Sequence, residues 1–361
     1  MTNVCVFDSE VLLTLKYANI QIHNFITSSF FPKQNFDFFN FLRNGLNGEV
    51  IDKKIRKAEF VDELYRTNDP RYENFIQNLI AFLECNNIDV ILSANNIIHP
   101  EILINELKSY VKILGVIDDP YVTYTKTIPY AWAFDGVFYI TPSISKRYTT
   151  KAFLEHIGVK KSYWFPHSPP QINETEDPED AFFTKRDKEM AYVGNPTGSK
   201  LNTLIHLKHN FGERFHLHGR WKMKGFYGTI GLFTGGEYMM KRVRPIPVNQ
   251  LYPLYRSIKI GINMHVSTQI ETGNKRMYEL PLCGAFQLCD KAAHGAHNLI
   301  FKENKEIVYY DDLNDLKDKI HYYLENDQER IKVARQGFFK AQKNYLFVDN
   351  FEKMITYFTQ K

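Results

Sequence analysis

The sequence predicts an α/β protein with two domains, each doubly wound around a parallel sheet, and three observations support this fold class. The length of 361 residues is long for one hydrophobic core and suits two. Short apolar runs alternate with longer helical patterns over the whole chain, as in parallel α/β folds. One stretch, 164–189, is rich in proline and acidic residues and has no apolar periodicity, which is typical of a linker.

The predicted domain boundaries follow from that stretch. We expect a first domain over 1–170, a linker over 171–188 and a second domain over 189–342. The segment 343–361 reads as one more helix, and we expect it to pack back on the first domain. Since doubly wound folds bind ligands at the carboxyl ends of their strands, two such domains predict a ligand-binding cleft between them.

Individual elements can be placed in both domains. The predicted strands are 4–7, 89–94, 111–117, 136–141, 189–194, 214–219, 258–264, 284–290 and 306–310. The predicted helices are 73–87, 100–110, 143–158, 198–210, 248–257, 275–283, 312–326 and 327–342. Pro100 beside an acidic first turn marks a helix start, and Gly158 marks a helix end. The region 221–247 mixes glycine, proline and basic residues and is predicted to be a long loop.

Composition narrows the class of protein. A hydrophobic content of 44% with 24% charged residues is ordinary for a globular chain and argues against disorder. The net charge of +4 suits an anionic small molecule as well as a nucleic acid. No apolar run approaches the ~20 residues of a membrane span, and the N-terminus reads as a strand rather than a signal peptide. The four cysteines form no C-x-x-C pair, so we expect buried thiols and a cytoplasmic location.

The most informative run is ETGNKRMYELPLCGAFQLCD (271–290). Its two acids, Glu271 and Glu279, have seven residues between them, a spacing that also returns to nearly the same face of any helix. Gly273 and Asn274, however, place Glu271 on a turn before the helix. The free N–H groups of a helix start suit a diphosphate, so this run predicts a nucleotide-binding turn as an alternative to a plain helix surface.

This run resembles the E-x7-E motif of retaining GT-B glycosyltransferases. Within it, KRMYELPLCGAFQLCD is similar to the Arg-x-(Phe/Tyr)-Glu-x4-Gly-x5-Asp run of CgeB-like glycosyltransferases. Further segments resemble that family in the same order, strongly for AYVGNPTGSKLNTLIHL (191–207), FHLHGRW (215–221) and the helix and strand over 254–265. GVIDDP (115–120) and FDGVFYITPS (134–143) resemble it more loosely, and the likeness covers roughly 85–345.

The resemblance implies a GT-B fold, in which two Rossmann-like domains face a central cleft. It implies transfer of a hexosyl or pentosyl group from a nucleotide sugar, expected to be UDP-linked, to an acceptor hydroxyl, with retention of configuration. The nucleotide sugar is then a co-substrate, and no cofactor or metal is expected. Without a metal, the negative charge of the leaving diphosphate must be met by fixed cations and amide dipoles.

Carried over by position, the resemblance implies two catalytic residues, Glu271 near the reacting carbon and Arg276 on the diphosphate. It implies that Glu279 binds the donor ribose. The other expected donor-binding residues are cations, loop residues and backbone amides: Lys200, Arg220, Gly194, Asn195, Thr272, Gly273 and Asn274. The expected acceptor or cleft residues lie near strand ends: Asp118, Asp119 and His265.

Several alternatives stay open. The turn beginning at Glu271 departs from the Glu-Gly-Phe-Gly of the broader retaining family, which leaves open whether Glu271 has the role of that family's glutamate. The basic, aromatic segment 221–245 has two interpretations. It is a surface for DNA, in which case the acceptor is a modified base, or it is a solvated loop. A nucleotide-sugar epimerase and a binding scaffold without transferase activity are further readings. The pair Asp118–Asp119 could ligate a metal, but it equally suits the cap of a turn.

Overall fold

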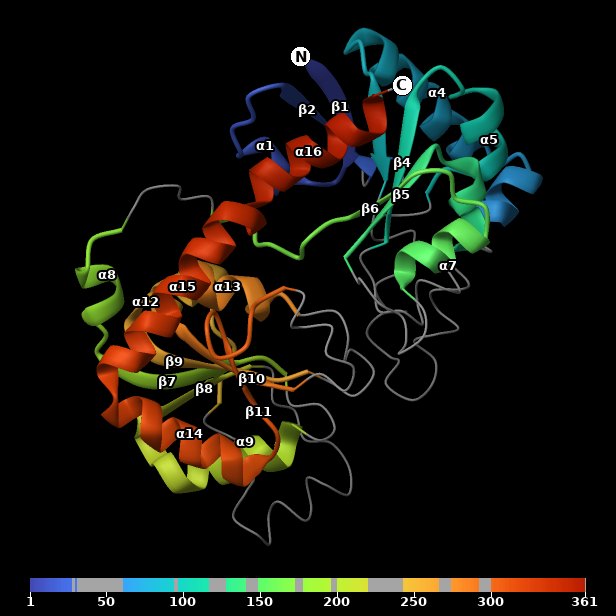
Figure 1. The fold of residues 1–361 in the computed structure, drawn as a ribbon. Coiled ribbons are helices and arrows are strands. Elements are labelled where there is room, and N and C mark those ends of the chain that lie inside the picture. The colour runs from blue at the N-terminus through green and yellow to red at the C-terminus, as the bar shows by residue number, and fades with distance from the viewer. Residues whose placement is uncertain are drawn as a thin grey trace, which may run out of the picture. The chain divides into compact units, whose positions relative to one another are not determined.

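The computed structural model describes residues 1–27, 30, 61–93, 97–116, 128–140, 149–172, 178–195, 200–219, 243–265, 274–291 and 300–360. The chain forms two compact units (Figure 1). Unit 1 comprises Met1–Pro166 together with Phe347–Lys361, and unit 2 comprises His167–Leu346. The predicted linker 171–188 thus lies inside unit 2, where its described part includes a short helix, α8 (Ala181–Thr184).

Unit 1 is built on six parallel strands in the order β2-β1-β3-β4-β5-β6. Their bounds are β1 (Thr2–Phe7), β2 (Ile20–Phe25), β3 (Val90–Ser93), β4 (Val111–Val116), β5 (Gly136–Tyr139) and β6 (Ser162–Trp164). Central strands such as β3 and β5 are buried along their whole length, because helices cover both faces of a parallel sheet.

Helices of unit 1 pack on opposite faces of this sheet. They are α1 (Glu10–Leu13), α4 (Pro70–Cys85), α5 (Pro100–Asn105), the 3-10 helix η3 (Ile128–Ala133), α7 (Thr150–His156) and α16 (Phe347–Thr359). Helices α4 and α5 join a core with Cys5 and Phe7, whereas α16 joins the core around Val4 and Val6. Alternate residues of β1 therefore point to different helices, as the period of a strand requires.

Unit 2 is built on five parallel strands in the order β11-β10-β9-β7-β8. Their bounds are β7 (Lys188–Val193), β8 (Phe215–His218), β9 (Ile258–Asn263), β10 (Phe286–Asp290) and β11 (Val308–Tyr310). From β7 the chain proceeds to β8 on one side, and from β9 it proceeds to β10 on the other. The order therefore reverses between β7 and β9, the place where doubly wound sheets bind their ligands.

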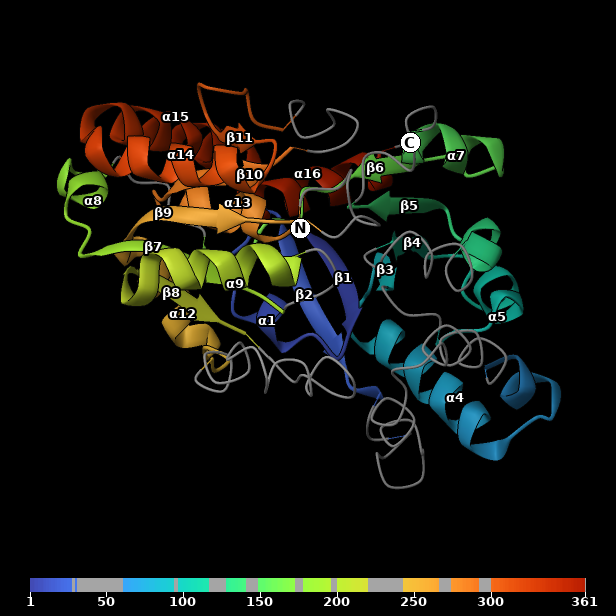
Figure 2. The ribbon, with the colours of Figure 1, turned by 90° about the horizontal axis from the view of Figure 1, so that it is seen from below.

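Helices cover both faces of this second sheet. Besides α8 they are α9 (Lys200–Phe211), the 3-10 helix η4 (Gly212–Arg214), α12 (Val248–Ser257), α13 (Arg276–Leu282), α14 (Leu313–Glu325) and α15 (Asp327–Tyr345). Figures 1 and 2 show α9 and α14 on one face, with α12 and α13 on the other. The backbone of Gly261 in β9 approaches the side chain of Leu280 in α13 so closely that a Cβ on Gly261 would lie 2.4 Å from that side chain.

One buried arginine connects the ends of α12 and α13. The guanidinium of Arg186 donates to the carbonyls of Tyr255 at 3.0 Å, Ile258 at 2.8 Å and Cys283 at 2.9 Å. These are carbonyls that a helix end leaves without a partner. Gly284, at a φ of 66°, completes the end of α13. The position of α13 is therefore fixed from its carboxyl end.

The element predictions hold in type and differ at several ends. Of the helix expected over 143–158, the described part starts at Thr150, where Thr149 Oγ1 accepts from Ala152 N at 3.1 Å, and Gly158 follows its end. The helix expected over 100–110 ends at Asn105. Strands β2 and β6 were not predicted, and most of the predicted loop 221–247 lies outside the described residues. In the part of the chain that the structure describes, no helix has the length and apolar character needed to span a bilayer.

Candidate functional site

Polar side chains gather in unit 2 where the strand order reverses. Gly194 and Asn195 directly follow β7, and Lys200 begins the helix after them. His265 follows β9, and Arg276 begins α13. Because β7 and β9 are parallel neighbours, their carboxyl ends bring these two groups of residues to one edge of the sheet.

Arg276 is held at that edge by the strand ends themselves. Its Nη1 donates to the carbonyl of Val193 at 2.8 Å and its Nη2 to that of Met264 at 3.2 Å. The guanidinium lies over the ring of Tyr192, with its carbon 4.7 Å from the ring centroid. A Cβ at Gly194 would lie 2.6 Å from Nη1, so only glycine leaves room for this cation. The arginine is thus a fixed charge at the sheet edge.

Lys200 supplies a second cation beside it. Its residue is only 7% exposed, and within the described ranges it has no hydrogen-bond or ion-pair partner. Burial and the nearby Arg276 lower the pKa of Lys200 to about 8, while the carboxylate of Asp290 acts in the opposite direction. Because Arg276 disfavours the charge of the neighbouring Lys200, an anion placed between the two cations would be stabilised.

Glu279 contributes a buried carboxylate one turn further along α13. The residue is 4% exposed, and its Oε1 accepts from Tyr252 Oη at 3.4 Å and lies 3.8 Å from Lys275 Nζ. Tyr252 Oη is also 3.1 Å from Gln171 Oε1, and one hydroxyl proton cannot serve both acceptors. Burial raises the pKa of Glu279, against the effect of Lys275 and Arg276. The carboxylate therefore has acceptor capacity for further donors.

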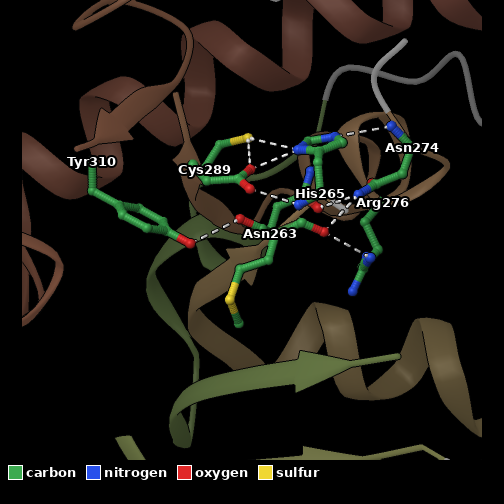
Figure 3. A network of polar contacts seen from close by, with 8 residues as sticks. Asn263, His265, Asn274, Arg276, Cys289 and Tyr310 are labelled. Atoms are coloured by element: carbon green, nitrogen blue, oxygen red, sulfur yellow. Dashed lines mark hydrogen bonds and ion pairs between the residues drawn. The ribbon is translucent and has the colours of Figure 1, made fainter. Parts of the chain in front are cut away.

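A hydrogen-bond network connects β9, β10 and the start of α13 (Figure 3). His265 Nδ1 lies 2.6 Å from Asp290 Oδ1, and the backbone N–H of His265 donates to Asp290 Oδ2 at 2.7 Å. The backbone N–H of Asn274 donates to His265 Nε2 at 3.1 Å. The side-chain amide of Asn274 donates to Asn263 Oδ1 at 2.7 Å and to the carbonyl of Met264 at 3.1 Å. The start of α13 is thus joined to the end of β9.

Three neighbouring side chains, His265, Cys289 and Asp290, are of types that can bind a metal ion. Their possible ligand atoms all lie within 4.8 Å of one another. A metal needs a thiolate and a free imidazole lone pair. Burial raises the pKa of the Cys289 thiol well above its ordinary value. Both imidazole nitrogens of His265 are engaged by hydrogen bonds. Among the described residues, this cluster therefore fits a hydrogen-bonded network better than a metal centre.

Seven of the predicted site residues are described, and most of them meet at this edge. Gly194, Lys200 and Arg276 adjoin one another, and His265 contacts Asn274. Glu279 shares α13 with Arg276, and Asn195 lies in the loop after β7. The remaining predicted residues fall outside the described ranges: Asp118, Asp119, Arg220, Glu271, Thr272 and Gly273. Their roles stay predictions.

Sequence reasoning assigned no role to several residues that shape the site. Asp290 and Asn263 belong to the segments that resemble the CgeB-like family, so this resemblance could have identified them as site residues. Tyr252 and Gln171 carried no such signal, because their contacts with each other and with Glu279 join segments far apart in the sequence. Helix α13, at whose start the diphosphate was predicted to bind, has seven residues. Charged side chains dominate this site.

Comparison with known proteins gives the class of the chain. Residues 201–356 match the family model described as glycosyl transferase-like. No curated protein matches the chain. Sucrose-phosphate synthase from Thermosynechococcus elongatus has a similar structure, with a TM-score of 0.53 at 12% identity, covering 82% of this chain and 78% of that one. The OtsA apo structure gives a TM-score of 0.55 at 12% identity and covers 100% of both chains.

A third similar structure is an alpha-glucosyltransferase in complex with UDP-glucose and DNA containing an abasic site. Its TM-score is 0.56 at 11% identity, and the match covers 79% of this chain and 83% of that one. Likeness at such low identity establishes a shared fold, which is the predicted GT-B fold of two parallel-sheet α/β units. The family match over 201–356 indicates a glycosyltransferase, and the fold agrees with it.

Proposed function

We propose that the chain is a CgeB-like glycosyltransferase that transfers a sugar from a UDP-linked donor to an acceptor hydroxyl, with retention and without a metal. The observation that carries this proposal is the placement of Lys200, Arg276 and Glu279 at the reversal of strand order in unit 2. Two cations suit the diphosphate of a nucleotide sugar. A buried carboxylate that can accept further hydrogen bonds suits the vicinal hydroxyls of a ribose.

The chemistry of the step follows from these charges. The bond between the anomeric carbon and the diphosphate oxygen breaks, and the acceptor oxygen forms its bond on the same face of the sugar. The acceptor proton passes to the leaving phosphate oxygen. Lys200 and Arg276 stabilise the charge that develops on the diphosphate, and stabilisation of this kind is usually the largest single contribution to catalysis. The preference for a uridine nucleotide is supported by the similar structures that hold UDP-glucose or UDP.

Glu279→Gln is expected to weaken UDP binding about tenfold to a hundredfold, because a neutral amide loses the charge-assisted hydrogen bonds to the ribose hydroxyls. Isothermal titration calorimetry measures this. The same substitution should change the affinity for 2′,3′-dideoxy-UDP by less than about threefold, since that nucleotide lacks the hydroxyls. An equal loss for both nucleotides would show that Glu279 does not read the ribose.

Lys200 gives the proposal a pH dependence. A lysine with a pKa of about 8 carries its charge at neutral pH and loses it as the pH rises through 8. We expect UDP affinity to fall between pH 7 and pH 9.5, approaching about tenfold per unit above the pKa if only the charged lysine binds. Lys200→Arg should remove the slope, because arginine stays charged over this range. A flat wild-type profile by calorimetry would contradict the role of Lys200.

The acceptor is best tested directly. Release of UDP from a panel of UDP-sugars with glycans, small hydroxyl compounds and hydroxymethylated DNA as acceptors separates the alternatives. Stimulation by modified DNA alone, with a steep salt dependence of DNA binding, would favour the base-modifying alternative. Exchange of one UDP-sugar for its epimer, without any acceptor, would favour the epimerase. UDP binding with no turnover of any donor would favour the binding scaffold.

A further inference from the structure

The pair formed by His265 and Asp290 has a definite protonation pattern. Asp290 accepts through both oxygens, from the ring of His265 at 2.6 Å and from its backbone N–H at 2.7 Å. A carboxylate only accepts, so the ring proton sits on Nδ1. On the far side of the ring, the backbone N–H of Asn274 can only donate, so Nε2 must present its lone pair. The contacts therefore select the neutral imidazole with its proton on Nδ1.

This tautomer lets His265 hold the turn before α13. Asn274 is held through its backbone by His265 and through its side chain by Asn263 and Met264. The carbonyl of Met264 accepts from both Asn274 and Arg276. The end of β9 thus fixes the turn before α13 and the guanidinium of Arg276 in one arrangement (Figure 3).

We propose that His265 and Asp290 are a positioning pair, which holds Asn274 and thereby sets Arg276 for the donor diphosphate. His265 was predicted as an acceptor or cleft residue, and the present proposal gives it a role that acts through Asn274. The inference rests on the proposed donor site, because its effect on binding is read through Arg276. Asp290 has a second effect, since its charge also favours the charged form of Lys200.

Two substitutions of the histidine separate the two sides of the ring. His265→Asn places a donor amide near the position of Nδ1 and keeps the Asp290 contact, but the new side chain is too short to reach Asn274. His265→Gln extends to the position of Nε2, where its carbonyl oxygen can accept from Asn274 N–H, and it gives up Asp290. We expect His265→Asn to weaken UDP binding about tenfold to a hundredfold, and His265→Gln to stay within about threefold of wild type.

The experiment measures UDP affinity by calorimetry and melting temperature for the full-length wild type and both variants. If both variants bind UDP as wild type does, the positioning role is overturned. The same holds if the two affinities fall in proportion to the loss of melting temperature, because a merely structural role predicts that pattern. If the wild type itself binds no nucleoside diphosphate, the proposed function fails instead, and the two failures are distinguishable.

The tautomer provides a readout that needs no ligand. Nitrogen-15 NMR of the histidine side chains in the nucleotide-free protein is expected to show the His265 ring protonated at Nδ1 only. Asp290→Asn removes an acceptor and offers an amide donor to Nδ1, so this variant is expected to move the proton to Nε2 and to lose the Asn274 contact. A wild-type ring protonated at Nε2 overturns the inference.

Discussion

Removing residues 347–361 is expected to unfold unit 1 while unit 2 stays folded. Helix α16 contributes four large side chains to the unit 1 core, Phe351, Met354, Ile355 and Phe358, each at most 5% exposed. Burying one such side chain stabilises a fold by about 1.5–3 kcal/mol, so four are worth about 6–12 kcal/mol. That is comparable to the usual net stability of a whole domain, about 5–15 kcal/mol.

Polar contacts of α16 add to the effect. The carboxylate of Glu352 accepts from the backbone N–H groups of Ala18 and Asn19, in the loop between β1 and β2. Lys161 Nζ donates to the carbonyl of Gln360 at 2.6 Å, next to β6. The helix therefore holds both edge strands of the sheet. Without it, these groups and the apolar face of β1 and β3 would meet water.

Hydrogen–deuterium exchange of the shortened chain measures the outcome. Amides of β1, β3 and β4 are expected to lose protection, while those of β9 and β10 keep it. Phe351→Ala in the full chain tests the same core with one side chain and should cost about 3–5 kcal/mol, whereas Lys353→Ala on the exposed face of α16 should cost less than about 0.5 kcal/mol. Wild-type protection of β1 in the shortened chain would contradict the expectation.

The sequence predicted most of the fold because the buried strands have a clear local pattern. Runs such as DVILSA (89–94) and IKIGINM (258–264) are apolar over most of their length, since both faces of a parallel sheet are covered. Strand β2 (IQIHNF) was missed because it lies at an edge and is only partly buried. Its polar residues are held by tertiary contacts, such as that of His23 with Asn86 at 3.1 Å, that no local pattern contains.

The candidate site was likewise predicted only in part from the sequence. Arg276 and Glu279 were predicted because they lie in one contiguous run whose pattern resembles a known motif. The contact of Glu279 with Tyr252 spans 27 residues, and that of Tyr252 with Gln171 spans 81. Such pairs form only once the sheet brings distant segments together. Local sequence can therefore place the charged residues, but it cannot show which neighbours orient them.

Arg276→Lys is expected to lower kcat/KM about 10²–10³-fold, and the loss should be larger in kcat than in the affinity for UDP. Arginine donates to the carbonyls of Val193 and Met264 at the same time, and a guanidinium has five N–H donors in all. A lysine ammonium cannot bridge two strand ends and meet a diphosphate in a fixed geometry. The charge is kept, but its position is lost.

Hydrolysis of UDP-sugars without an acceptor, followed by UDP release, measures this effect without knowledge of the acceptor. Arg214→Lys is the matched control, because Arg214 is exposed, lies at the amino end of β8 and pairs with Glu189. Wild-type hydrolysis by Arg276→Lys would mean that Arg276 only supports the fold. In that case its melting temperature, and not its turnover, would differ from that of the control.

Gly194→Ala tests the same cation from the opposite side. The added Cβ would lie 2.6 Å from Arg276 Nη1 and 2.8 Å from Tyr192 Oη, so the guanidinium must move although its charge and length are unchanged. We expect a loss of turnover of the same sign as for Arg276→Lys. If turnover depends on the position of the charge and not only on its presence, both Gly194→Ala and Arg276→Lys should lose turnover, although each keeps a positive charge. Equal turnover of Gly194→Ala and wild type would show that the site tolerates displacement of Arg276, and the leaving diphosphate would then depend chiefly on Lys200.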